Sequence, residues 1–281
     1  MTTMRSFRDS FADALEMLCT EIDYMSSFYS NLAYLAIGKH LLAVDSSYVD
    51  FSRNYDAISN NLASMSLLFQ RECFADAITL LRRLDDLFIL DIYIMTLLQM
   101  DSQKVSVDFS KFHKTREYQL LRSWGIGFGS SAKFPRRGIM IDVIKNWSGL
   151  SDLNQLLEKS GSFLSIHKWL NDFVHANAFS HMVMNSGGVL PAAASSIVKQ
   201  CLQIIRSLSA QHISYILMLN PTLVSSEDYM MAMDDGEEPS EGMQYVVAPF
   251  VQEMFDHIFH KRREDIAQFI LHNMPVPMGL V

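Results

Sequence analysis

The chain has 281 residues, of which 49 % are hydrophobic, so it can bury one large core or two smaller ones. Its net charge of −8 argues against nonspecific binding of nucleic acid or acidic membrane by the whole surface. The three cysteines show no CxxC spacing, which favours a reducing compartment over a disulfide framework or a zinc site. With no signal-peptide pattern and no uncharged apolar run of membrane-spanning length, the predicted location is cytoplasmic and no membrane partner is expected.

The charge is unevenly distributed along the chain. From Lys104 to Arg137, eight lysines and arginines face two acids, a local net charge of +6. From Glu227 to Glu241 there are seven acidic residues and no basic one. This asymmetry keeps a local polyanion site open. The charged fraction of 19 % is slightly low, so we expect some apolar surface to be buried against a partner, most simply in a homodimer.

The first hundred residues show helical periodicity almost throughout. Apolar residues recur at steps of three and four from Ser6 to Leu42, which predicts an amphipathic helix. A turn and cap at residues 45–47 precede a second helical stretch, Tyr48 to Gln70. A third helical stretch covers Arg71 to Leu98 and is either separate from the second or continuous with it.

The middle of the chain is less regular. Four glycines and a proline mark a loop from Trp124 to Gly138. Helices are predicted around it and after it, over residues 111–124, 139–147, 151–159, 163–182 and 191–219.

The C-terminal part begins with an acidic, Gly- and Pro-interrupted stretch, residues 222–249, which predicts a mobile surface loop. A last helix is expected over 250–273, followed by an extended tail. Strand signals are scarce, and 105–107 is the one short alternating segment. The prediction is an all-α fold, a helical bundle with an irregular, Gly-rich middle, in a single domain over residues 1–281.

The helix predicted over 163–182 has two unlike faces. One is an apolar stripe of the kind that packs into a core. Nearly opposite lies His175, with Lys168, Asn171 and Asp172 one to two turns earlier. A polar centre with an apolar rim is typical of a cleft or an interface. The alternative is that His175 makes an ordinary hydrogen bond between helices.

A metal site is not predicted. His167 and His175 are eight residues apart, about 12 Å along a helix, too far to share a zinc ion. We therefore expect no metal and no cofactor.

A second candidate lies within residues 78–91. Arg82 and Asp85 fall in the middle of an apolar helix face, and Arg83 points to the opposite side. A charge on such a face must be paired. The pair either fixes the helix register or orients a catalytic group or an anion, for which the planar fork of arginine is suited.

The Gly-rich loop supplies three basic residues, Lys133, Arg136 and Arg137. It matches neither nucleotide-binding glycine pattern. Basic and aromatic side chains there predict contacts with RNA backbone and bases, or simply a mobile basic loop.

The segment Leu170 to His175, LNDFVH, resembles the motif of the HEPN superfamily of helical proteins in bacterial defence and toxin systems. Those proteins carry an arginine, often followed by Asn, Asp or His, and then a histidine four to six residues after the arginine. Related proteins have an earlier helix with an arginine and an acid one turn later, as at Arg82 and Asp85. This chain departs from the motif, because Lys168 and its two successors occupy the positions of the arginine.

The resemblance implies an HEPN-like core over residues 48–220 and a homodimer with facing motif helices. In active members the reaction is metal-independent RNA cleavage by attack of the 2′-hydroxyl. His175 would then be the general acid or base, Asn171 would orient it, and Lys168 or Arg82 would stabilise the phosphorane, with Asp172, Asp85 and Asp86 in support.

Two functions follow from these observations. One is a ribonuclease of phage-defence or toxin type, favoured by the His175 cluster and the basic middle segment. The other is a noncatalytic interaction module that has kept the fold, favoured by the low charge, the acidic stretch and the missing motif arginine.

Overall fold

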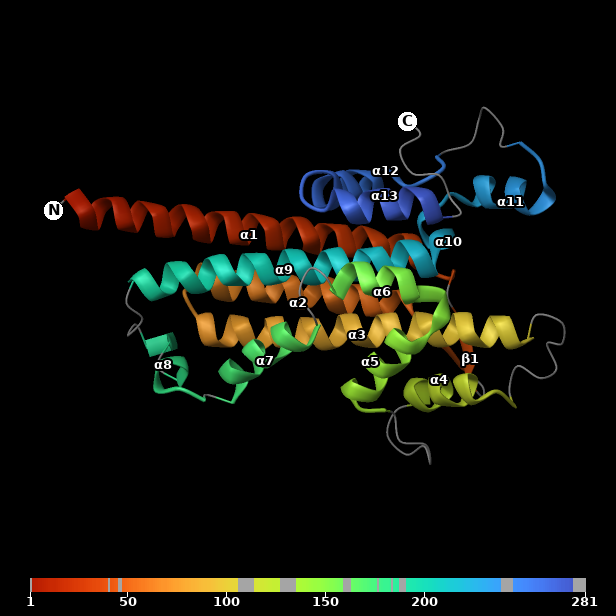
Figure 1. Cartoon of the computed structure of the whole chain (residues 1–281), viewed down its shortest axis with the longest axis horizontal. Helices are drawn as coiled ribbons and strands as arrows, with labels where there is room; N and C mark the ends of the chain where they lie inside the picture. The colour runs from red at the N-terminus through yellow and green to blue at the C-terminus, as the bar shows by residue number, and fades with distance from the viewer. Residues whose placement is uncertain are drawn as a thin grey trace. The chain divides into compact units, whose positions relative to one another are not determined.

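The computed structural model describes residues 2–39, 41–44, 47–105, 114–126, 135–158, 163–175, 177–182, 184–186, 191–238 and 245–274 (Figure 1). Helices dominate these residues, so the predicted all-α class is confirmed. The elements, in chain order, are α1 Thr2–Ala36, β1 Leu41–Val44, β2 Ser47–Asp50, α2 Ser52–Gln70, α3 Phe74–Val105, α4 Arg116–Ile126, α5 Arg137–Asn146, η2 Ser148–Leu150, α6 Ser151–Glu158, α7 Phe163–Val174, α8 Phe179–Met182, η3 Met184–Ser186, α9 Pro191–Leu219, α10 Pro221–Val224, α11 Glu227–Asp235, α12 Pro249–Phe255, the π-helix η4 Asp256–His260 and α13 Glu264–Asn273.

The chain divides into two compact units. The first comprises Met1–Ser30, Tyr55–Phe88 and Leu157–Gln211, and the second comprises Asn31–Asn54, Ile89–Leu156 and His212–Val281. The long helices α1, α2, α3 and α9 contribute residues to both units. That the chain is one domain stays a prediction.

Buried aromatic and polar contacts join four helices within the first unit. Tyr29 of α1 and Phe88 of α3 are fully buried, with ring centroids 5.5 Å apart. Ser26 of α1 donates a hydrogen bond to a backbone carbonyl of α2 at 3.0 Å. Glu21 of α1 accepts a 2.6 Å charged hydrogen bond from Arg206 of α9. These segments therefore form a helical bundle whose apolar faces converge, as their periodicity requires.

A sharp turn separates α2 from α3, which the sequence left open as one continuous helix. Glu72 adopts a left-handed conformation with φ 58°, and its amide donates to the carbonyl of Phe69. A left-handed residue after the last helical turn ends a helix. The turn reverses the chain, so the start of α3 can pack beside α2, and the Phe69 and Phe74 rings lie 6.2 Å apart across it.

The second unit is organised around a buried polar network. Asp91 of α3 accepts hydrogen bonds from Asn54 of α2 at 3.0 Å and from the His212 ring of α9 at 3.1 Å. His212 is fully buried and the Asp91 side chain is 4 % exposed. Tyr215, one turn further along α9, donates to Asn154 of α6 at 2.5 Å. Buried polar groups must be hydrogen-bonded, and this network fixes the register of the helices that carry them.

Two local predictions at the ends of helices were wrong. The first predicted helix ends at Ala36 rather than Leu42, and β1 and β2 form an antiparallel hairpin that pairs Leu41 with Asp50 and Val44 with Ser47. The helix expected from Tyr48 begins only at Ser52. The hairpin segment has the sequence LLAVDSSYVD. Its β-branched and aromatic residues on either side of a short polar stretch are a hairpin signal, which the prediction of continuous helices left out. The candidate strand at 105–107 begins inside α3, and residues 106 and 107 lie outside the described ones.

The acidic stretch 222–249 is not simply a loop. It contains the end of α10 and all of α11, whose first turn is capped by the Ser226 hydroxyl accepting from the Tyr229 amide. Glu227 and Asp228 stand in that first turn, where carboxylates stabilise the positive end of the helix. The helix ends at Gly236 in the left-handed conformation with φ 69°. The sequence therefore contains helix-capping signals here, although its acidic composition predicts a loop.

The predicted last helix, residues 250–273, is broken into three parts. After α12 the chain widens into the π-helix η4 and then turns at Lys261 before α13 begins. Phe255, Ile258 and Phe259 are buried across this break. Apolar periodicity continues through it, which is why the sequence reads as one helix.

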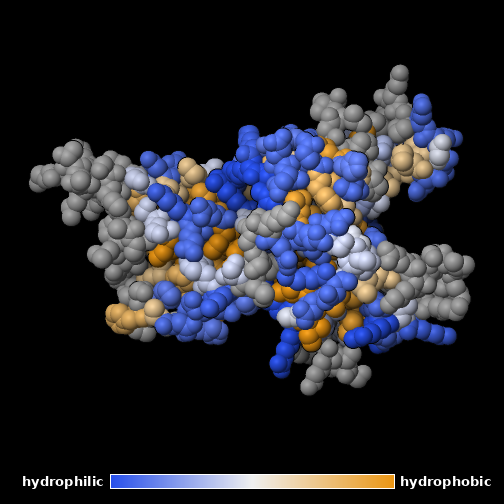
Figure 2. Space-filling model, in the orientation of Figure 1, coloured by the Kyte–Doolittle hydropathy of each residue, from blue (hydrophilic) through white to orange (hydrophobic). Residues whose placement is uncertain are grey.

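The surface mixes polar and apolar side chains. On the face drawn in Figure 2, apolar residues are interspersed among hydrophilic ones. The exposed large apolar residues include Tyr34 and Phe179, at 80 % and 74 %. Among the described residues, no helix has the length and apolar character needed to cross a membrane.

Candidate functional site

The helix predicted over 163–182 ends early. α7 stops at Val174, and a turn leads to the short helix α8. Asn177 ends α7, because its amide donates to the Asp172 carbonyl at 3.0 Å and its side chain donates to the Asp172 carboxylate at 2.9 Å. Asparagine competes for backbone and side-chain partners in this way and so favours helix ends. The prediction of one continuous helix was wrong.

His175 consequently lies in the turn after α7 and is exposed. Lys168 is exposed as well, and Asp172 is half-buried. Within the described part of the chain, no hydrogen bond or ion pair joins the side chain of His175 to Arg82 or to Asn171. The side chains of His175 and Arg82, which the sequence proposes as partners, are therefore neither hydrogen-bonded nor ion-paired within the described chain, and their catalytic roles stay predictions.

Arg82 of α3 instead contacts a different histidine, His167 of α7. Its Nε donates to Asn171 Oδ1 at 2.8 Å, and its Nη2 lies 3.3 Å from Nε2 of His167. The other ring nitrogen, Nδ1 of His167, lies 2.9 Å from Asp85 Oδ2. Arg82 Nη1 is 3.9 Å from the same Asp85 oxygen and forms an ion pair with Asp86. We call these five residues, Arg82, Asp85, Asp86, His167 and Asn171, the Arg82 cluster.

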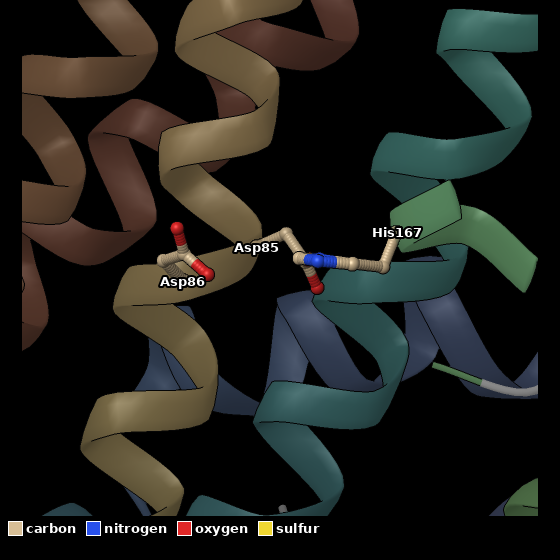
Figure 3. Close-up of side chains that lie close together, drawn as sticks. All are labelled: Asp85, Asp86 and His167. Atoms are coloured by element: carbon tan, nitrogen blue, oxygen red, sulfur yellow. The ribbon is translucent and has the colours of Figure 1, made fainter. Parts of the chain in front are cut away.

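The spacing of residues on two helices builds the cluster. Arg82, Asp85 and Asp86 are three and four residues apart and so share one face of α3. His167 and Asn171 are four apart on α7. Figure 3 shows the Asp85 side chain of α3 and the His167 ring of α7 pointing toward one another. All five residues belong to the first unit.

The hydrogen bonds define the tautomer of His167. A guanidinium can only donate, so Nε2 must accept from Arg82 and carries no proton. The proton is then on Nδ1, which donates to the carboxylate of Asp85. His167 is a neutral imidazole held between a fixed cation and a fixed anion.

The side chains of the Arg82 cluster range from fully buried to exposed. The Asp85 side chain is fully buried, those of Arg82 and His167 are 16 % and 19 % exposed, and that of Asp86 is 48 % exposed. With one arginine, two aspartates and a neutral imidazole, its net charge is −1. The predicted pairing of Arg82 with Asp85 is thus part of a larger network that reaches solvent at Asp86.

His167 is the residue that sequence reasoning missed. The sequence considers it only as a zinc ligand together with His175, because it lies next to the apolar stripe. The apolar stripe expected from the sequence comprises Phe163, Ile166, Leu170, Phe173 and Val174. Leu170 and Phe173 are buried, whereas Val174 is 41 % exposed. The sequence does contain a signal for this site. His167 and Asn171 are four residues apart beside a buried stripe, and both need partners from another helix.

The corner between α7 and α8 is fixed against the end of α7. The His181 ring stacks on Phe173 with centroids 4.1 Å apart, and its Nδ1 lies 3.1 Å from the Asp172 carbonyl oxygen. Phe179, in the first position of α8, remains 74 % exposed. The corner therefore presents an aromatic ring and the imidazole of His175 to solvent.

Three residues of the cluster are ligand types for metal ions. One ligand atom each from Asp85, Asp86 and His167 lie within 4.8 Å of one another. The expectation of no metal rested on pairs of histidines within one helix, and it did not consider donors from two helices.

The predicted basic loop is described only in part. Lys133 lies outside the described residues. Arg136 is exposed just before α5, and Arg137 is half-buried in its first turn. Both belong to the second unit. Their RNA-binding role stays a prediction.

The second unit holds a cavity of about 390 Å³ near the start of α11. Tyr34, Lys39, Glu227 and Tyr245 are among its lining residues. Burial lowers the pKa of Lys39, against the opposing effect of the Glu227 carboxylate, and Lys39 Nζ donates to the Ser225 carbonyl at 3.3 Å.

Comparison of the chain with known proteins finds no matching family model, curated protein or solved structure.

Proposed function

We propose that this chain is an HEPN-like helical protein that cleaves RNA without a metal ion, with His167 rather than His175 as its acid–base group. The observation that carries the proposal is the arrangement of His167 between Asp85 and Arg82. An imidazole whose Nδ1–H is held by a buried carboxylate has a fixed ring orientation and a stabilised protonated form.

The substrate phosphodiester would engage Arg82 at the exposed side of the cluster. Its oxygens attract the guanidinium away from Nε2 of His167, because arginine binds phosphate with two parallel hydrogen bonds. The freed Nε2 then takes the proton of the 2′-hydroxyl. The 2′-oxygen attacks phosphorus, the bond to the 5′-oxygen breaks, and the imidazolium or water protonates that oxygen.

The remaining residues support these steps. Arg82 neutralises the phosphorane charge, and Asn171 holds the guanidinium through Nε. Asp85 stabilises the imidazolium that forms. Lys168 is exposed on the same helix as His167 and supplies positive charge for the backbone of the RNA. In this proposal the protein is a homodimer of bacterial defence or toxin type, as the resemblance implies.

A second candidate is the noncatalytic interaction module. It is favoured by the closure of the cluster on itself, since both ring nitrogens of His167 are engaged and two carboxylates compete for one guanidinium. A net charge of −1 also opposes the approach of a polyanion. In that case the cluster fixes α7 against α3 and performs no chemistry.

Product analysis separates the two candidates. The purified chain is incubated in EDTA with a single-stranded RNA and with the DNA of the same sequence. The proposal predicts RNA fragments ending in a 2′,3′-cyclic phosphate and intact DNA, because the attacking group is the 2′-hydroxyl. Intact RNA at high protein concentration would reject it in favour of the interaction module.

A further inference from the structure

The Arg82 cluster already holds a cation. The guanidinium of Arg82 is ion-paired with Asp86 and lies 3.9 Å from Asp85. Around it stand two carboxylates and one imidazole, with ligand atoms within 4.8 Å of one another (Figure 3). Carboxylate oxygen and imidazole nitrogen together are the donors that first-row divalent metal ions accept.

We infer that Asp85, Asp86 and His167 form a site for a divalent transition-metal ion such as Zn²⁺, which enters in place of the Arg82 guanidinium. The ion and the guanidinium exclude one another, because both need the same carboxylates. Arg82 is therefore the intramolecular competitor of the metal, and its withdrawal opens the site.

The ligand atoms must shift slightly to bind the ion. Bonds of about 2.1 Å in tetrahedral arrangement place ligand atoms about 3.4 Å apart. His167 Nδ1 and Asp85 Oδ2 are 2.9 Å apart and must separate slightly, and all three ligand atoms lie within 4.8 Å of one another. The Asp86 side chain is 48 % exposed, so it can rotate toward the other two. Asn171 Oδ1 loses its donor when Arg82 leaves and becomes a fourth oxygen ligand or holds a water.

The charges favour the exchange. With Arg82 in place the cluster carries −1, and with a divalent ion and Arg82 in solvent the two aspartates and the ion sum to zero. The side chains of Arg82 and His167 are 16 % and 19 % exposed, so water reaches the groups that the guanidinium leaves. Once Arg82 leaves, Nε2 of His167 is free to take the ring proton, so Nδ1 becomes the unprotonated nitrogen that binds the ion.

The test is a calorimetric titration of the full chain, freed of metal with EDTA and then dialysed, with Zn²⁺. Asp86→Asn should weaken binding at least about tenfold, because it removes a charged ligand. Arg82→Gln should tighten binding at least about tenfold, because it removes the competing cation. Arg83→Gln is the matched control, since its side chain is exposed on the same helix, and it should leave the affinity unchanged.

Two further measurements keep the result decisive. Far-UV circular dichroism establishes that each variant is folded, and His175→Ala removes an exposed histidine that could bind Zn²⁺ adventitiously. Zn²⁺ affinity that is unaffected by Asp86→Asn, or weakened in folded Arg82→Gln, overturns the inference. The titration contains no RNA, so its outcome is independent of whether the chain cleaves RNA.

Discussion

Replacing the buried aspartate of the Arg82 cluster should cost far more stability than replacing its neighbour. Asp85 is fully buried and accepts a hydrogen bond from His167 at 2.9 Å, whereas Asp86 is 48 % exposed. Asp85→Ala leaves the Nδ1–H of His167 without this acceptor and removes one of the two carboxylates facing Arg82. Removing one partner of a buried ion pair costs about 3–5 kcal/mol.

The expected value lies at the lower end of that range. Arg82 and His167 keep 16 % and 19 % of their side chains exposed, so water compensates part of the loss. We expect Asp85→Ala to lower the free energy of unfolding by about 3 kcal/mol. Asp86→Ala, on the same turn of α3, should lower it by at most about 1 kcal/mol, as is usual for an exposed ion pair.

Urea unfolding followed by far-UV circular dichroism measures both values. The adjacent positions share helix and substitution, so differences in helix propensity cancel. Equal losses for the two variants, or a loss below about 1 kcal/mol for Asp85→Ala, would refute the assignment of Asp85 as the buried anchor of His167.

The remaining predictions concern other parts of the chain. His212→Ala should lower the free energy of unfolding by about 3–5 kcal/mol, because it leaves a buried carboxylate without its imidazole; a loss under about 1 kcal/mol in urea would contradict the network. Cys73, which is half-buried, should be the one thiol that reacts with Ellman's reagent in the native protein, the other two being buried; three fast-reacting thiols would contradict this. A hydrogen bond from Arg263 lowers the pKa of Asp265, so its carboxylate stabilises the fold above the unfolded pKa of about 3.9, and this contribution disappears as the pH falls through the lower folded value. The stability difference between wild type and Asp265→Asn should therefore shrink on acidification, and a difference that grows instead would show the opposite sign.

Much of the fold follows from apolar periodicity alone. The helix predicted over 191–219 coincides with α9, and that over 151–159 with α6 to within one residue. Long periodic segments are predictable because a buried face requires apolar residues at fixed steps. Breaks within periodic stretches, as at Asn177 and at η4, could not be predicted in this way, because local side-chain hydrogen bonds and a change of helix type leave the apolar pattern intact.

Sequence analysis names four of the five residues of the Arg82 cluster and misses His167. Arg82 and Asp85 were identified because charges on an apolar face must find partners. The histidine of α7 that they contact could not be identified in the same way, since the rotation of one helix against another decides which residue they meet. His167 and Asn171 are the residues of α7 that contact Arg82, and His175 lies in the turn after the end of α7.

The central claim is that His167, not His175, performs acid–base chemistry on RNA. The most direct measurement is the rate of RNA cleavage in EDTA by wild type, His167→Ala and His175→Ala under identical conditions. We expect His167→Ala to lower the cleavage rate about 100-fold or more, the usual contribution of a general acid or base, while His175→Ala keeps most of the rate. Full activity in His167→Ala, or a loss confined to His175→Ala, would contradict it.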